Sequence, residues 1–325
     1  MARSTLSSSA VAPGTAVHPV PGRPIALNLL LSLRPGQWTK NLFVFAGLLF
    51  GNASLGRGLF DPQSLQHAVA AFAIFCGLSG VIYVVNDVMD READRLHPVK
   101  SRRPIASGAL PVPAALSAAV VIAAVTLAGS AWLGQKFLLV GVSYLVLQLL
   151  YSGLLKHMVI LDVLAISFGF VMRAVAGAVA VDVDISQWLL VCTTLLALFM
   201  ALAKRRHEIV LLADEAITHR PILKEYSPYL LDQMIGVVTA STLLAYAFYT
   251  ISPETIAKFH TPWLLLTIPF PLYGIFRYLY LVHQREEGGS PSDLLINDRP
   301  LLICVAMWVA TIVVLLYGPW GHGSI

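Results

Sequence analysis

The chain has 325 residues, of which 57% are hydrophobic and only 12% are charged. A soluble globular domain would struggle to bury so much apolar surface, so this composition indicates a polytopic membrane protein. The net charge of +4 comes from bases beside apolar segments without a nucleic-acid motif, and the three cysteines show no CxxC spacing. We therefore expect no nucleic-acid partner, no zinc site and no disulfide framework.

Residues 1–24 are rich in Ser, Ala and Pro and lack an apolar core, so they predict a disordered tail rather than a secretory signal. Residues 25–320 contain nine apolar runs of about 20 residues, the length that crosses a bilayer as a helix. Because a membrane helix satisfies its own backbone hydrogen bonds, we expect a single all-α transmembrane domain. The predicted spans are 28–50, 65–87, 112–133, 137–155, 158–181, 186–203, 230–251, 262–282 and 301–318.

The bases between the spans predict the orientation of the chain. If the N-terminus is cytoplasmic, nearly all of them fall in cytoplasmic segments, and only Arg57, Lys136 and Lys258 fall outside. Lys and Arg are enriched on the cytoplasmic side of membrane proteins, so the asymmetry supports nine spans and a cytoplasmic N-terminus together. The same rule accounts for the presence of each base even if the base binds no ligand. It does not explain carboxylates, which are costly near membrane helices unless they are paired or used.

Three carboxylates lie at the cytoplasmic end of the second span. If the helix continues through this end, Asp87, Asp90 and Asp94 fall within an arc of about 60° on one face. Carboxylates gathered in this way repel one another unless they share a cation, and oxygen ligands favour Mg²⁺ or Mn²⁺. The pattern predicts a magnesium–diphosphate site, with Asn86 at its edge and the bases from Arg91 onward facing the anion. The alternative is a solvated loop in which DREADR forms surface ion pairs.

Polar residues also interrupt the start of the first span, where Arg34, Trp38, Lys40 and Asn41 occur within RPGQWTKN. Trp is an ordinary anchor at the membrane interface and Lys an ordinary snorkelling residue, so the segment has a structural explanation. Lys40 and Asn41 are adjacent polar groups at an apolar boundary. The functional interpretation is that they reach phosphate or ribose oxygens.

A second polar group, Tyr151, Lys156 and Asp162, lies near the predicted cytoplasmic face. Arg173 follows Asp162 by three turns on the same helix face and therefore lies deeper in the membrane. A lone arginine at that depth needs a partner or an aqueous cavity. For Arg173 we favour a structural ion pair or a carbonyl cap between helices over contact with a substrate.

The sixth span ends in ALAKRRHE, which contains Lys204, Arg205 and Arg206 in succession. Topology alone explains a triple base. A diphosphate, however, needs several donors, and guanidinium groups bind phosphate oxygens in pairs. At least one of the three bases is therefore a candidate ligand.

Several motifs together resemble a known family. NDVMDREAD and SRRPIASGALP, after a helix that begins RPGQWTKN, resemble the UbiA-type intramembrane prenyltransferase superfamily over most of residues 30–318. With YSGLLKHMVILDV, GFVMRAVAG and ALAKRRHE, the sequence is similar to the decaprenyl-phosphate phosphoribosyltransferase branch. Ordinary members carry a second Asp-rich motif, whereas here Asp162 is a lone acid with Lys156 before it. This departure favours the branch whose diphosphate belongs to phosphoribosyl diphosphate (PRPP).

The resemblance implies nine helices around a central cavity in a bacterial cytoplasmic membrane, with the active site on the cytoplasmic side. It implies that Asp87, Asp90 and Asp94 hold Mg²⁺ and the diphosphate, and that Asp162 contacts ribose hydroxyls or a second metal. The residues implied to assist the metal or to orient PRPP are Lys40, Asn41, Asn86, Arg103, Tyr151, Lys156, Lys204, Arg205 and Arg206.

The expected reaction is attack by an oxygen of a polyprenyl phosphate on the anomeric carbon of PRPP, with release of pyrophosphate. A phosphate monoester is already an anionic nucleophile, so the protein needs only to stabilise the leaving diphosphate and to align the substrates. Two alternatives are a prenyltransferase with an aromatic or haem-type acceptor, and a transporter with Asp162 and Arg173 as a coupling pair. The sequence leaves open the length of the lipid and whether the chain forms a homo-oligomer.

Overall fold

The computed structural model describes residues 23–97, 99–184, 186–219, 221–285, 294–295 and 297–318. In this part of the chain the regular secondary structure is helical and contains no strand, which confirms the predicted fold class. The tail predicted over residues 1–24 lies outside the described residues, apart from residues 23 and 24.

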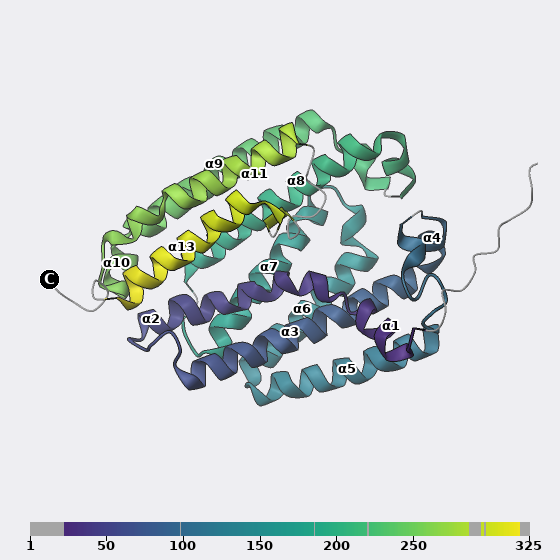
Figure 1. Cartoon of the computed structure of the whole chain (residues 1–325), viewed down its shortest axis with the longest axis horizontal. Coiled ribbons are helices and arrows are strands. Elements are labelled where there is room, and N and C mark those ends of the chain that lie inside the picture. Colours follow the sequence, from purple (N-terminus) through teal and green to yellow (C-terminus); the bar gives the residue numbers. More distant parts are fainter. Residues whose placement is uncertain are drawn as a thin grey trace, which may run out of the picture.

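Eight helices of the described chain are long and apolar enough to cross a membrane, and they correspond to eight of the predicted spans (Figure 1). They are α3 (Pro62–Met89), α5 (Val112–Trp132), α6 (Gln135–Gly153), α7 (Leu161–Ala180), α8 (Gln187–His219), α9 (Pro228–Ile251), η6 with α11 (Trp263–Thr267 and Pro269–Gln284) and α13 (Arg299–Tyr317).

The first predicted span is not one regular helix. It consists of α1 (Ile25–Ser32), a 3₁₀ segment η1 (Pro35–Val44), π-helical turns η2 (Gly47–Gly51) and the short α2 (Asn52–Ser54). The break falls where Arg34 adopts a left-handed conformation, with φ of 53°, immediately before Pro35. Proline disfavours an α conformation in the preceding residue, which accounts for the break. A ninth crossing by this segment stays a prediction.

Several membrane helices begin at a capping residue that the sequence provides. The side chains of Asp61, Ser227 and Asp298 accept hydrogen bonds from backbone N–H groups in the first turns of α3, α9 and α13. A proline follows each cap within two residues, at a position where its missing N–H is no loss. These starts fix where each helix enters the bundle.

The helices form two groups that meet along α7 and α8. One group, the first segment with α3, α5, α6 and α7, has a core that contains Phe75, Phe137 and Tyr144. The other, α8 with α9, α11 and α13, has a core that contains Phe199 and Tyr278. The short elements α4 (Arg91–Leu96), η3 (Lys100–Arg102), η4 (Leu155–His157) and η5 (Pro221–Glu225) lie at one end of the bundle, here called the charged end.

The first segment packs unusually close to α7. A Cβ atom built on Gly47 would overlap the backbone of Gly177, and one built on Gly177 would overlap the carbonyl oxygen of Val44. Only glycine permits backbones to approach in this way, and small residues at helix interfaces are typical of membrane bundles. The two glycines therefore set the position of the irregular segment against the rest of its group.

We expect Gly177→Ala to lower the free energy of unfolding by about 2 kcal/mol, because the added methyl must push η1 away from α7. The thermal unfolding midpoint of the purified protein in detergent measures the effect. Gly236→Ala in α9 is the matched control, since a Cβ there meets nothing within 4 Å. Equal midpoints for the two variants would contradict the close approach.

Candidate active site

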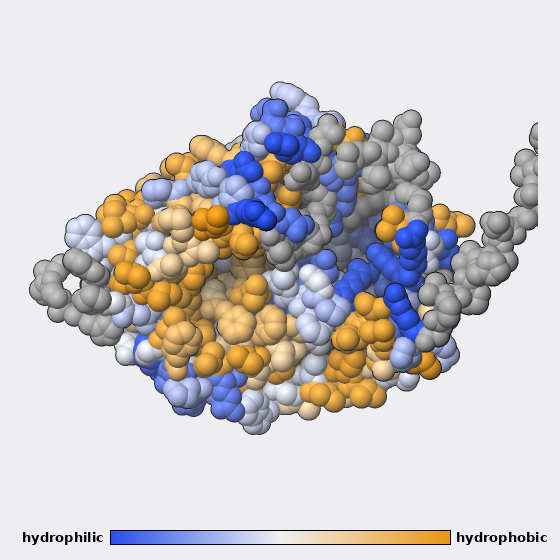
Figure 2. All heavy atoms as spheres, viewed as in Figure 1, coloured by the Kyte–Doolittle hydropathy of each residue, from blue (hydrophilic) through white to orange (hydrophobic). Residues whose placement is uncertain are grey.

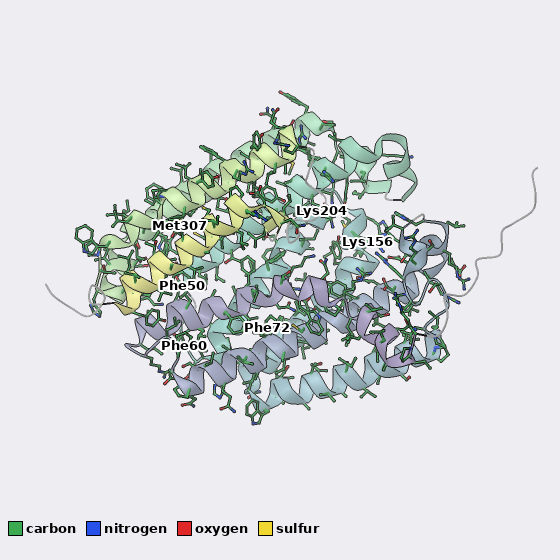
Figure 3. All side chains as sticks on the ribbon, in the orientation of Figure 1. Phe50, Phe60, Phe72, Lys156, Lys204 and Met307 are labelled. Carbon is green, nitrogen blue, oxygen red and sulfur yellow. The ribbon has the colours of Figure 1, made fainter. Side chains whose placement is uncertain are left out.

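A cavity of about 1910 Å³ lies between the two helix groups. Near the charged end its lining includes basic side chains, among them Arg34, Lys40, Arg103 and Lys204. The remaining lining is mostly apolar and aromatic and continues past Phe50 (Figure 3). Figure 2 shows the same contrast on one face, with hydrophilic residues gathered near α4 and hydrophobic residues around the hollow beside them. The cavity thus has a basic end and a long, mostly apolar body, and its lining also includes Asp184, Glu254 and Lys258.

At the charged end, two buried carboxylates converge on one guanidinium. Asp87 and Asp94 are 2% and 4% exposed. The Nη1 atom of Arg103 donates to Asp87 Oδ1 at 3.1 Å and to Asp94 Oδ2 at 2.6 Å. Two buried acids seven residues apart are therefore joined through a single cation, which removes most of their mutual repulsion.

The local backbone brings the two carboxylates together. Helix α3 ends at Met89, and α4 starts at Arg91 with Asp90 as the junction, so the predicted continuous helix is interrupted at this point. Asp90 itself faces another partner, because its Oδ1 atom lies 3.6 Å from the Nζ atom of Lys156. The three predicted metal ligands are thus divided into a bridged buried pair and a more exposed third acid.

The donor set at Asp87 and Asp94 fits Mg²⁺. Within the described residues, no three His, Cys, Asp or Glu side chains are arranged to hold a metal by themselves. Magnesium does not require such a cage, because it commonly uses one or two carboxylates together with waters and substrate phosphates. The convergence of both carboxylates on Arg103 Nη1 shows that they can face one positive charge.

Arg34 was noted in the sequence as a polar residue of the first span but was not among the predicted site residues, and the structure places it beside Asp87. It donates to Asp87 Oδ1, its guanidinium lies 4.9 Å from the centre of the Tyr83 ring, and it lines the cavity. Its only sequence signal was a base before a proline at the start of the first span. The contact with Asp87, 53 residues away, depends on how that segment packs.

Asp162 and Arg205 are buried together behind the cavity wall, 0% and 1% exposed. Arg205 donates from Nε to Asp162 Oδ2 at 2.9 Å and from Nη1 to Glu208 Oε2 at 2.7 Å. The other oxygen of Asp162 accepts a hydrogen bond from Tyr226 at 2.8 Å. These bonds join α7 to α8 and favour a structural role for the pair. A ribose or second-metal contact by Asp162 stays a prediction.

Asn41 and Arg173 form another buried contact. Asn41 is 0% exposed and accepts a hydrogen bond from Arg173 Nε at 2.7 Å. The remaining nitrogens of Arg173 donate to the Gly169 carbonyl and to the Tyr144 hydroxyl. The Gly169 carbonyl belongs to α7 itself, so this bond is not the predicted cap between helices. The bonds of Arg173 to other elements are those to the Asn41 amide and the Tyr144 phenol.

The hydrogen-bond partners of Arg173 and Asp162 argue against the transporter alternative. That hypothesis pairs Arg173 with Asp162, whereas Arg173 is bound to Asn41 and Asp162 to Arg205. The observed bonds remove the coupling pair on which it depended.

The predicted site residues fall into two sets. Those that line the cavity are Lys40, Asn86, Arg103, Tyr151 and Lys204. Those outside its lining are Asn41, Asp87, Asp90, Asp94, Lys156, Asp162, Arg205 and Arg206. Within the second set, Asp87 and Asp94 reach the cavity through Arg103, whereas Arg206 turns to Asp232 on α9.

The chain belongs to the UbiA prenyltransferase family, whose sequence pattern matches residues 42–297. Two relatives bear the name decaprenyl-phosphate phosphoribosyltransferase. The one from Corynebacterium glutamicum is 34% identical, over 91% of this chain and 89% of the relative. The one from Mycolicibacterium smegmatis is also 34% identical, over 91% of this chain and 95% of the relative.

A solved structure has the same fold. It is a UbiA homologue from Archaeoglobus fulgidus bound to DMAPP and Mg²⁺, and it aligns with a TM-score of 0.69 at 21% identity. The alignment covers 89% of this chain and 99% of that chain. The likeness confirms the all-α fold, and the eight apolar helices together with the family identify the chain as an integral membrane protein.

We expect Asn41→Leu to lower the free energy of unfolding by about 2 to 3 kcal/mol, because it leaves the buried Arg173 guanidinium without one acceptor. Thermal unfolding in detergent measures this loss. Gln37→Leu, on the same segment and in the cavity lining, is the control and should unfold near the wild-type midpoint. If Asn41→Leu keeps wild-type stability and only weakens substrate binding, the structural role is wrong.

Proposed function

We propose that the chain transfers the phosphoribosyl group of PRPP to a polyprenyl phosphate at the charged end of the cavity. The observation that carries the proposal is the Asp87–Arg103–Asp94 bridge at the basic end of a long apolar cavity. The bridge provides acids for a cation and a base for phosphates, and the cavity provides an apolar wall for a lipid. The names of the two bacterial relatives support the same reaction.

The polar substrate is bound by groups on several elements. Asp87 and Asp94 would hold Mg²⁺, which would supply positive charge to the leaving diphosphate. Arg34 and Arg103, which meet these acids and also line the cavity, would then turn their donors to phosphate oxygens. Lys40 and Lys204 line the same end and add positive charge around PRPP.

The reaction is a displacement at the anomeric carbon of the ribose. An oxygen of the lipid phosphate forms the new C–O bond, and the bond to the diphosphate breaks with its electron pair leaving on the diphosphate. The nucleophile arrives as an anion, so no side chain has to accept a proton. The protein contributes alignment and a positive environment for the leaving group.

The lipid enters from the membrane. Leu42 of the first segment and Val309 of α13 line the cavity and are 52% and 36% exposed, which supports a lateral opening toward the bilayer there. The bases gathered at the charged end support a cytoplasmic location for that end, because Lys and Arg are enriched on the cytoplasmic side of membrane proteins. PRPP would therefore come from the cytoplasm and the lipid from within the bacterial cytoplasmic membrane. Assembly into a homo-oligomer stays a prediction.

The purified protein with Mg²⁺, PRPP labelled in the ribose and a polyprenyl phosphate should produce a lipid-extractable label and pyrophosphate. Omission of Mg²⁺ or addition of EDTA should abolish the transfer. A label that stays aqueous, while a prenyl diphosphate is consumed with an aromatic acceptor, would establish the prenyltransferase alternative instead.

Asp87→Asn and Asp94→Asn should each lower the rate of transfer by roughly 100-fold or more, because each removes a charge that supports the leaving group. The same variants should bind Mn²⁺ more weakly in the presence of pyrophosphate, a readout that does not depend on turnover. Glu92→Gln in α4 is the control, since Glu92 is exposed and pairs with Arg95. Near-normal rates and Mn²⁺ binding in the two Asp variants would overturn the metal assignment.

A further inference from the structure

The turn before α7 has a strained backbone. Ile160 links η4 to α7 with φ of 67° and ψ of −43°. A β-branched residue at positive φ costs about 1 to 3 kcal/mol and persists only where the surroundings hold it. Something outside the turn must therefore fix this conformation.

Tyr226 is the group that holds the turn. Its hydroxyl accepts the Ile160 N–H at 2.7 Å and donates to Asp162 Oδ1 at 2.8 Å. Tyr226 is 4% exposed, and burial raises the pKa of its hydroxyl to about 12, so the group keeps its proton at neutral pH. Asp162 is in turn fixed by Arg205 Nε at 2.9 Å. Tyr226, which lies between η5 and α9, therefore ties the turn and Asp162 together, and Asp162 connects them to Arg205 of α8.

The same turn carries a base of the candidate site. Lys156 lies four residues before Ile160 in η4, and its Nζ atom is 3.6 Å from Asp90 Oδ1 at the end of α3. Figure 3 shows Lys156 and Lys204 at the charged end of the bundle. The Lys156 and Asp90 side chains are 26% and 49% exposed, and exposed ion pairs contribute only about 0 to 1 kcal/mol. That pair is too weak to fix η4, whereas the buried hydrogen bonds of Tyr226 are strong enough.

We propose that Tyr226 is a positioning residue for phosphoribosyl transfer, which holds the Ile160 turn and thereby places Lys156 beside the diphosphate of PRPP. The proposal rests on the proposed function. Tyr226 lies 64 residues after Asp162 in sequence and touches Asp162 and Ile160 rather than the cavity lining. Tyr226 would therefore affect the binding of PRPP indirectly, by fixing the position of Lys156.

Steady-state kinetics with PRPP as the varied substrate test the proposal. Tyr226→Phe should raise the KM for PRPP about tenfold with kcat within about twofold of wild type, and Lys156→Met should do the same. In the double variant the two effects should not multiply, because both remove one contact. Tyr229→Phe is the matched control, since Tyr229 lies three residues after Tyr226, in the first turn of α9, and is 75% exposed.

A rescue separates positioning from mere structural support. Ile160→Gly removes the Cβ that strains the turn, so Ile160→Gly with Tyr226→Phe should bring the KM for PRPP back to within about twofold of wild type. The proposal is supported if Ile160→Gly restores the KM for PRPP and if the effects of Tyr226→Phe and Lys156→Met do not multiply in the double variant. If Tyr226→Phe only lowers the melting temperature, with unchanged KM and no rescue by glycine, Tyr226 is a structural residue and the proposal is overturned.

Two further outcomes separate this inference from the proposed function. Wild-type protein that transfers phosphoribose while Lys156→Met keeps a normal KM would overturn the positioning role and leave the reaction intact. Wild-type protein that transfers nothing from PRPP would overturn the proposed function, and this inference with it.

Discussion

The Arg103 guanidinium between Asp87 and Asp94 is the contact on which the charged end depends. A carboxylate buried beside an apolar bundle is costly without a partner, and here two such carboxylates share one cation. The bridge ties the end of α3 to α4 and to the segment after η3. Arg34 adds a second guanidinium to Asp87 and so brings the first segment to the same point. The elements that surround the proposed PRPP site are thus assembled around two buried acids.

The buried arginines differ in how many of their N–H donors are bonded to protein acceptors, and this difference helps to distinguish structural arginines from candidate phosphate ligands. Arg173 donates from Nε, Nη1 and Nη2 to protein acceptors, so these bonds occupy three of its five N–H donors, although its side chain also lines the cavity. Arg205 is 1% exposed and outside the cavity lining, and its Nη2 atom has no partner among the described side chains. Arg103 instead uses Nη1 for both acids while its side chain lines the cavity. Its position on the cavity wall beside the two acids favours Arg103 over Arg173 and Arg205 as a phosphate ligand.

The sequence predicted the membrane helices, because apolar length is a local property. The metal-binding role of the Asp run stays a prediction, and the expected continuous helix is interrupted at Asp90. The sequence could not predict which neighbour of a polar pair faces the cavity. Adjacent residues of a 3₁₀ segment point about 120° apart, so Lys40 lines the cavity while Asn41 is buried against Arg173. Pairings across long sequence separations, such as Arg34 with Asp87, depend on packing and leave no local pattern.

The triple base at the end of the sixth span shows the same geometry most fully. Lys204 lines the cavity, Arg205 turns to Asp162 on α7, and Arg206 turns to Asp232 on α9. The three adjacent cations therefore face in three directions, and of the three only Lys204 lines the cavity. Because Arg205 is bonded into the contact between the two helix groups, it also fixes where Lys204 stands relative to the acids of α3. One base of this run thus lines the candidate site, and the other two bind the helices around the cavity to one another.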